Sequence, residues 1–308
     1  MDYKRANRAF LYSTISTLAF VLLFSLWQAT SGRTISVVMN NFLSEMVVLV
    51  PVIATVLYAG EKLSVVIPLK RIKISSVLMT VLYVLCLYPL ITLVNAVSML
   101  FVDNEIAGMV GDITAEPMWL MLLSIGIFGP FVEEIIFRGV ILQSFQRTGR
   151  IIGSMIISSL MFGMMHMNFN QFAYGAVMGF MLSLLVEATG SVISSFIAHG
   201  IFNSIEVILM YAASDTIENA EEILGELGYK NTVLLSIGIY FVLAVIFTAL
   251  ALCVVYRISD LEGRKEFFSS IPRCKKQGYK LITFSWILAT VLSFAYMTWI
   301  TVMLKILS

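Results

Sequence analysis

The sequence predicts an all-α polytopic membrane protein, a bundle of about eight or nine transmembrane helices that forms a single membrane domain over residues 1–308. Composition is the first observation behind this prediction. Apolar residues make up 59% of the 308 residues and charged residues only 13%, and the mean hydropathy is +0.93. Such a chain has too few polar side chains to cover a water-facing globule, so the lipid bilayer must solvate most of its surface.

The second observation is a series of apolar segments that are long enough to cross a bilayer. A hydrocarbon core of roughly 30 Å needs about 20 apolar residues per helix. Segments of about this length follow one another with short connections. They are residues 10–29, 42–59, 76–101, 118–146, 150–167, 171–188, 191–212, 232–256 and 281–304.

Two of these segments allow another interpretation. Residues 10–29 follow a basic start and resemble a signal peptide, but an h-region is only about 7 to 15 residues long, so we expect a retained helix. Residues 42–59 carry Glu45 near their start and Pro51 near their middle. A charge and a proline both disfavour a membrane-crossing helix, so a re-entrant segment is an alternative there.

The third observation is that basic and acidic connections alternate along the chain. By the positive-inside rule, this alternation places the N-terminus in the cytoplasm and, after nine spans, the C-terminus outside. It assigns no role to the acidic loop 214–230. The basic connections are the N-terminus, 62–73, 147–150 and 257–280, and the acidic ones are 103–116 and 214–230.

Charge and cysteine usage exclude other classes of protein. The formal net charge is +1, which gives no pull toward nucleic acid. Cys86, Cys253 and Cys274 are scattered along the chain, so they predict neither a disulfide framework nor a CxxC metal site. The sequence predicts no soluble domain longer than about 25 residues, so any chemistry is expected in or beside the bilayer.

Ionisable side chains concentrate in the 118–146 segment, which contains Glu133, Glu134 and Arg138. A charge at bilayer depth costs roughly 2.5 to 3.5 kcal/mol, so such residues indicate a functional site. Glu134 and Arg138 are four residues apart and can pair along one helix face. Glu133 has no local partner, and an uncompensated carboxylate suits a general base or acid. An ion-pair network that only orients the helix is the alternative.

Both histidines of the chain, His166 and His199, also lie in apolar segments. Asn203 follows His199 by four residues, so its amide could orient the imidazole or donate to a developing oxyanion. The 118–146 and 150–167 segments are expected to form a hairpin that brings His166 within about one helical turn of Glu133. Simple packing by these polar side chains between helices is the alternative.

Three motifs therefore occur in order, each on its own apolar segment. Together they resemble the CPBP family of intramembrane proteases, also called Abi proteins, which includes the type II CAAX prenyl endopeptidases. The resemblance covers 117–212 as a CPBP-like catalytic core, with 1–116 and 213–308 as flanking transmembrane helices. The motifs are EExxxR at Glu133, Glu134 and Arg138, FxxxH at Phe162 and His166, and HxxxN at His199 and Asn203.

The resemblance implies an intramembrane endopeptidase that hydrolyses a peptide bond of a membrane-associated or peptide substrate with glutamate-activated water. It implies Glu133 as the general base and His166 as the group that orients the water. His199 and Asn203 would hold the carbonyl and its oxyanion, and Glu134 and Arg138 would support them. Bacterial members of the family without prenylated targets are linked to peptide maturation, signalling or bacteriocin self-immunity. The resemblance therefore implies one of these roles and an integral protein of a bacterial plasma membrane.

Metal content and function class stay open. Glu133, His166 and His199 could bind a single zinc ion, but in the absence of an HExxH motif we favour a metal-free mechanism. A proton-coupled transporter would also bury such residues, although it predicts inverted repeats, which the sequence does not display. A noncatalytic membrane scaffold or immunity protein is the third hypothesis.

Overall fold

The computed structural model describes residues 1–214, 220–273 and 280–307. These residues form a helical bundle without any strand, which confirms the predicted fold class. Eight of the described helices are long and apolar enough to cross a membrane. Their outer faces carry many exposed apolar side chains, such as Leu22, Leu235 and Val245, as expected of a surface that lipid solvates.

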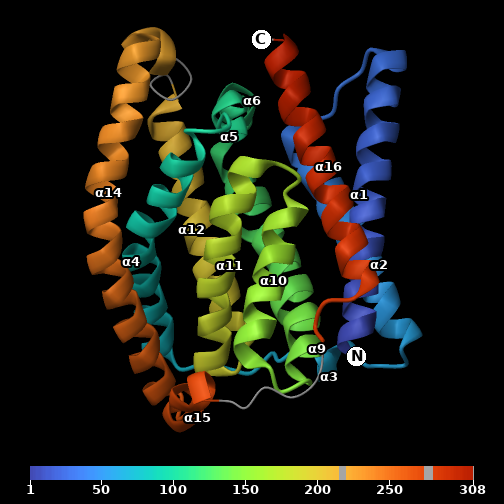
Figure 1. The fold of residues 1–308 in the computed structure, drawn as a ribbon, viewed down its shortest axis with the longest axis vertical. Helices are drawn as coiled ribbons and strands as arrows, with labels where there is room; N and C mark the ends of the chain where they lie inside the picture. Colours follow the sequence, from blue (N-terminus) through green and yellow to red (C-terminus); the bar gives the residue numbers. More distant parts are fainter. Residues whose placement is uncertain (215–219, 274–279, 308) are drawn as a thin grey trace.

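When the short helix Ile151–Met165 is counted with them, the membrane-length helices run alternately up and down the bundle (Figure 1). The composite helix Met118–Gln146 consists of α7 (Met118–Met121), η1 (Leu122–Phe128), α8 (Gly129–Glu134), η2 (Ile135–Ile141) and α9 (Leu142–Gln146). The other long helices are α1 (Tyr3–Ser31), α2 (Val37–Tyr58), α4 (Ile74–Ser98), α11 (Phe169–Thr189), α12 (Val192–Ala212), α14 (Ala220–Leu261) and α16 (Phe284–Leu307).

Shorter helices complete the described part of the chain. The composite helix, α11, α12 and the short α10 form the centre, with α4 and α14 on one side and α1, α2 and α16 on the other (Figure 1). The short helices are α3 (Leu63–Val66), α5 (Glu105–Gly108), α6 (Val110–Ala115), α10 (Ile151–Met165), α15 (Lys265–Ser270) and the 3-10 turn η3 (Ile271–Arg273).

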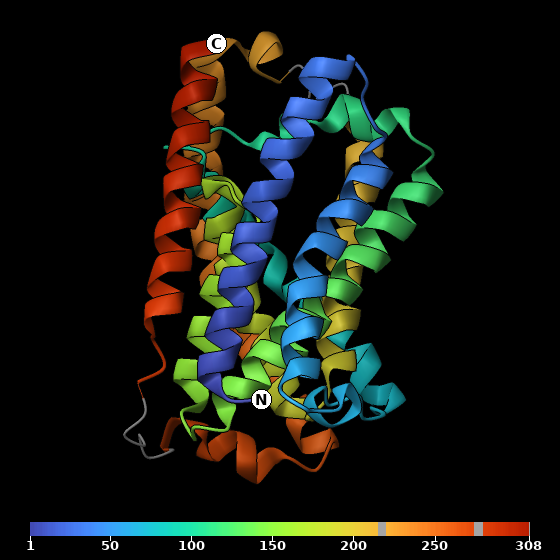
Figure 2. The same ribbon diagram turned by 90° about the vertical axis from the view of Figure 1, so that its right-hand side faces the viewer.

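Helix α10 corrects the expectation of nine full spans. It has 15 residues, about 22 Å at 1.5 Å per residue, which is less than the hydrocarbon core. Figures 1 and 2 show that the turn between α10 and α11 ends well below the upper ends of α1, α14 and α16. The predicted 150–167 span is therefore one arm of a hairpin that returns to the end from which it started.

Helix α2 bears out the predicted 42–59 helix, because it runs unbroken from Val37 to Tyr58 and is long and apolar enough to cross a membrane. A proline interior to a helix leaves a backbone carbonyl one turn earlier without its donor. The helix nevertheless continues through Pro51, and Thr55 donates from its hydroxyl to the Pro51 carbonyl at 2.7 Å. The re-entrant alternative for this segment is wrong.

The predicted loop 214–230 is partly helical. Residues 215–219 and Cys274 lie outside the described residues. Helix α14 already begins at Ala220, and Gly225 interrupts its first turns with a φ of 69°, a conformation that glycine adopts without steric cost.

The basic connections gather at one end of the bundle, the end at which the N-terminus lies in Figures 1 and 2. Arg147, before α10, pairs with Glu61, after α2, at 2.8 Å. Arg264, before α15, donates from Nε to the Glu187 carbonyl oxygen at 3.0 Å. The C-terminal end of α16 lies at the opposite end of the bundle (Figures 1 and 2).

Candidate active site

The composite helix that carries both adjacent acids contains two π-helical segments, η1 before α8 and η2 after it. Such segments are rare and occur often at functional sites. Side chains from neighbouring helices bind the carbonyls of η1. Asn203 of α12 donates to the Ile125 carbonyl at 3.2 Å, and Asn41 of α2 donates to the Ser124 carbonyl at 3.2 Å. These hydrogen bonds fix the orientation of the composite helix about its own axis.

Glu134, Arg138 and His199 form a buried cluster at the centre of the bundle. Arg138 Nη1 lies 2.9 Å from Glu134 Oε1, so the predicted ion pair along one helix face is present. His199 Nδ1 lies 3.0 Å from the same oxygen. The exposed fractions are 0% for Glu134 and Arg138 and 3% for His199. The carboxylate therefore neutralises the guanidinium and orients the imidazole at the same time.

Glu133 finds its partner on another helix, since its Oε2 lies 3.5 Å from His199 Nε2. The two ring nitrogens of His199 thus face the two neighbouring glutamates, one on each side. The Glu133 side chain retains 17% exposure, whereas the Glu134 side chain has none. Of the two acids, only Glu133 has an exposed part of its side chain.

Phe162 of α10 contacts Arg138 and both histidines. Its ring centroid is 4.3 Å from Arg138 Cζ, a cation–π contact. The His166 ring packs against it edge-on at 5.1 Å, and the His199 ring at 5.6 Å. The sequence indicated Phe162 only as a letter of the FxxxH motif and gave it no place in the predicted site.

His166 is the C-cap residue of α10, and its ring contacts the buried cluster through Phe162. Asn168 donates from its amide to the His166 carbonyl at 3.1 Å, and Met167 between them has a φ of 55°, which is uncommon for a residue other than glycine. The His166 ring nitrogens have no hydrogen-bond partner among the described residues. They are free to bind water or substrate.

Asn203 lies one turn beyond His199 and does not orient it. Its amide donates to the backbone of η1, and Glu134 is the group that binds His199 Nδ1. An asparagine amide has two N–H donors, so one is left for a substrate oxygen.

Glu45 of α2 lies near the composite helix, whereas from the sequence its charge predicted only a weaker span. Its Oε1 lies 3.6 Å from the position that a Cβ would occupy at Gly129, one helical turn before Glu133. The signal was present in the sequence as a carboxylate inside an apolar segment.

Glu133, His166 and His199 are the residues that the sequence offers as possible zinc ligands. In the described parts of the chain, no group of three or more His, Cys, Asp or Glu side chains is placed to hold a metal ion. Both ring nitrogens of His199 face carboxylates. The His166 ring packs against the Phe162 ring.

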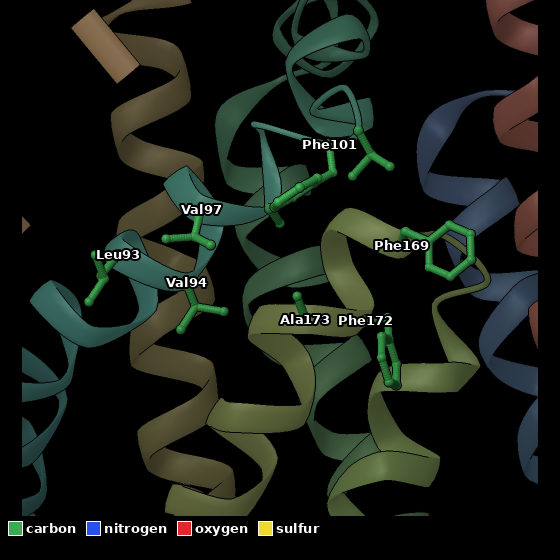
Figure 3. Close-up of a pocket in the computed structure, with 9 residues that line it drawn as sticks. Leu93, Val94, Val97, Phe101, Phe169, Phe172 and Ala173 are labelled. Atoms are coloured by element: carbon green, nitrogen blue, oxygen red, sulfur yellow. The ribbon is translucent and has the colours of Figure 1, made fainter. Parts of the chain in front are cut away.

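An apolar pocket of about 490 Å³ lies between the end of α4 and the start of α11 (Figure 3). It contains no ionisable side chain, so it is a hydrophobic surface and not the place of the chemistry. It is lined by Leu93, Val94, Val97, Ser98, Phe101, Val102, Phe169, Phe172 and Ala173.

The central region of the chain is similar to known proteins. Residues 115–205 match the family described as type II CAAX prenyl endopeptidase Rce1-like. This match supports a likeness of the segment to the CPBP/CAAX proteases, which the three sequence motifs predicted. The Rce1-like segment contains all six predicted site residues.

A relative of the Rce1-like segment occurs in Bacillus subtilis (strain 168), the protein named "Putative membrane peptidase YdiL". The two are 31% identical over 90 residues, which are 29% of this chain and 37% of the relative. The match thus spans little more than a third of the relative's length. No solved structure matches the chain.

Proposed function

We propose that this protein is an intramembrane endopeptidase that hydrolyses a peptide bond of a membrane-associated or peptide substrate. The observation that carries the proposal is the position of His199 between Glu134 at 3.0 Å and Glu133 at 3.5 Å. An imidazole held between a buried and an accessible carboxylate suits general acid–base chemistry. The Rce1-like match supports the same class of reaction.

Glu133 is the proposed general base. It accepts a proton from water, whose oxygen then forms a bond to the carbonyl carbon of the scissile peptide. The electron pair of the C=O π bond moves to oxygen and forms an oxyanion. When the oxyanion collapses, the C–N bond breaks and the proton held by Glu133 passes to the leaving nitrogen. The products are one carboxylic acid and one amine, so atoms and charge balance.

The other residues act around this step. The free ring nitrogens of His166 hold the water or the substrate carbonyl, and the second amide N–H of Asn203 donates to the oxyanion. Glu134 keeps His199 in one orientation, and Arg138 compensates the buried charge of Glu134. The reaction as proposed is metal-free.

The proposed location is a bacterial plasma membrane, with the N-terminus in the cytoplasm. The gathering of basic connections at one end supports this orientation, and the bacterial relative supports the host class. The substrates as proposed are peptides or membrane proteins that enter the bundle from the bilayer. Peptide maturation, signalling and bacteriocin self-immunity are the proposed physiological roles.

The test compares peptide ends in membranes that contain the intact protein, Glu133→Gln or Glu187→Gln. Glu187 is a matched control because it is a buried acid within a span, bound by Gln146 and far along α11 from His166. We expect new peptide N-termini with the intact protein and with Glu187→Gln, and none with Glu133→Gln. A peptide identified in this way is then cleaved by purified protein in liposomes.

A double variant with His166→Ala and His199→Ala tests whether the two imidazoles are needed for cleavage. If it produces the same new N-termini at the same rate, the proposed hydrolysis is excluded. If membranes with the intact protein, with any variant and without the protein all contain the same peptide N-termini, the protein is not a protease. A transporter or a scaffold is then the remaining hypothesis.

A further inference from the structure

The α2–α4 connection, residues 59–73, carries exposed basic side chains at one end of the bundle. Figure 1 shows that it crosses the end at which the N-terminus lies. Because it joins two membrane-length helices, it lies at the surface of the bilayer. Its exposed basic residues are Lys62, Lys70, Arg71 and Lys73.

Apolar side chains are exposed beside these cations. The exposed fractions are 69% for Val65, 61% for Leu69 and 80% for Ile74, the first residue of α4. Such a mixture suits the headgroup region of a membrane, because the cations bind phosphates while the apolar side chains enter the boundary with the acyl chains. A free anion or a soluble acidic partner would match the cations but would leave these apolar side chains in water.

Three of the cations are available to a ligand. Lys62, Lys70 and Arg71 form no ion pair within the described residues, whereas Lys73 donates from its ammonium group to the Leu261 carbonyl oxygen. A cluster of basic residues next to a membrane-spanning helix attracts anionic lipid, by about fivefold in affinity for each cation. The connection therefore has both the charge and the apolar surface that an anionic phospholipid requires.

The backbone of the same connection is bonded to the start of α12. The Pro68 carbonyl oxygen accepts a hydrogen bond from the Val192 amide at 2.9 Å, and the Lys70 carbonyl oxygen accepts one from the Ser191 hydroxyl at 2.6 Å. Ser191 is the N-cap residue of α12, the helix that carries His199. The connection thus contacts the membrane surface on one side and a helix of the candidate site on the other.

We propose that the α2–α4 connection binds the headgroups of anionic phospholipids through Lys62, Lys70 and Arg71 and thereby holds the start of α12 in place. The lipid phosphates pair with the three cations, while Val65 and Leu69 lie in the boundary with the acyl chains. Lipid that orders the connection also orders α12, because the two are hydrogen-bonded. Lipid binding goes beyond the proposed function, and only its effect on cleavage rests on that function.

The first experiment measures lipid binding by the purified protein in detergent. Phosphatidylglycerol and phosphatidylcholine are titrated separately into the intact protein, into Arg71→Gln and into Arg33→Gln, and native mass spectrometry follows the bound lipid. Arg33 is the matched control because it is an exposed arginine beyond the end of α1, at the opposite end of the bundle (Figure 1). Equal melting temperatures without added lipid show that the variants fold.

We expect the intact protein to bind phosphatidylglycerol more tightly than phosphatidylcholine. Arg71→Gln should lower the affinity for phosphatidylglycerol about fivefold, and a triple variant with Lys62→Gln, Lys70→Gln and Arg71→Gln should lower it about 100-fold. Arg33→Gln should bind like the intact protein. Equal affinity of the intact protein for the two lipids, or equal affinity of Arg71→Gln and Arg33→Gln for phosphatidylglycerol, would exclude the proposed surface. Displacement of the lipid by inorganic phosphate would show that the cations bind a free anion instead.

The second experiment measures the effect on α12. Backbone hydrogen exchange over residues 191–199 is compared in liposomes of phosphatidylcholine alone and of phosphatidylcholine mixed with phosphatidylglycerol. We expect slower exchange with phosphatidylglycerol in the intact protein and no change in the triple variant. The same exchange in both kinds of liposome would exclude the coupling to α12.

Peptide cleavage in the same liposomes separates failure of this inference from failure of the proposed function. Cleavage by the intact protein should rise with phosphatidylglycerol, and cleavage by the triple variant should not. If lipid binding and hydrogen exchange respond as expected and the intact protein cleaves nothing, the lipid surface stands and the peptidase proposal fails. If the protein cleaves but shows no preference for phosphatidylglycerol, the lipid surface fails and the peptidase proposal stands.

Discussion

The Nδ1 atom of His199 lies 3.0 Å from Glu134 Oε1, and Arg138 Nη1 approaches the same oxygen to 2.9 Å. One carboxylate oxygen thus joins the imidazole of α12 to the guanidinium of η2. All three side chains are buried, so each depends on the others for compensation in a region without water.

Removal of the Arg138 side chain should lower the stability of the protein. Arg138→Met leaves the Glu134 charge buried and unpaired, which we expect to cost about 3–5 kcal/mol of unfolding free energy. The double variant with Glu134→Gln removes both charges and should recover most of that loss. Unfolding in detergent, followed by circular dichroism, measures both. An Arg138→Met protein as stable as the intact one would show that the pair is not needed for the fold.

Phe162 should be important for activity beyond its contribution to packing. Its ring contacts Arg138, His166 and His199, whereas Phe145 is equally buried but lies in α9 outside the site. Phe162→Leu and Phe145→Leu should each cost about 0.5–3 kcal/mol of stability. Only Phe162→Leu should also lower cleavage, by about 10²-fold, because both imidazoles lose the surface that positions them. Equal activity of the two variants at equal stability would contradict this role.

Gly163 should be required for the close approach of α10 and α11. A Cβ there would lie 2.7 Å from the Phe172 carbonyl oxygen and 3.1 Å from the Ala176 nitrogen, and neither backbone atom can move freely. Gly163→Ala should cost about 1–3 kcal/mol of stability and displace the end of α10 that carries His166.

The matched control for this change is Gly238→Ala in α14, where a Cβ would meet no atom within 4 Å. It should be neutral or stabilise the helix by up to about 1 kcal/mol. Melting temperatures of the two variants in detergent distinguish them. Equal melting temperatures would mean that the two helices can separate without cost.

Glu61, outside the membrane-spanning segments, should make stability depend on pH at the basic end. Hydrogen bonds from Arg147, and then from the Met1 amino group, lower the pKa of Glu61 from about 4.5 to about 2. The folded-state pKa is lowered, so this contribution is present above about pH 4.5 and is lost as the pH falls toward 2. Thermal unfolding from pH 6 to pH 2 should therefore lose less stability in Glu61→Gln than in the intact protein. Parallel curves for the two proteins would show that the pair with Arg147 does not contribute.

The sequence by itself determined the features that depend on composition and on spacing within one helix. Lipid solvation followed from the scarcity of charged residues, and helices such as α1, α4 and α12 followed from apolar segments of bilayer length. The pairing of Glu134 with Arg138 followed from the fixed geometry of residues four apart. These features could be predicted because neighbours along a helix do not depend on the rest of the fold.

Only the tertiary structure decided which side chains meet across helices. It placed His199 between Glu133 and Glu134, Phe162 among the charged groups, and Glu45 beside α8. It also showed that α10 is too short to cross and that Asn203 binds the backbone of η1. These contacts depend on the depth and rotation of each helix, which the π-helical segments and the packing of glycines alter. Residue spacing in one segment contains no information about either quantity in its neighbour.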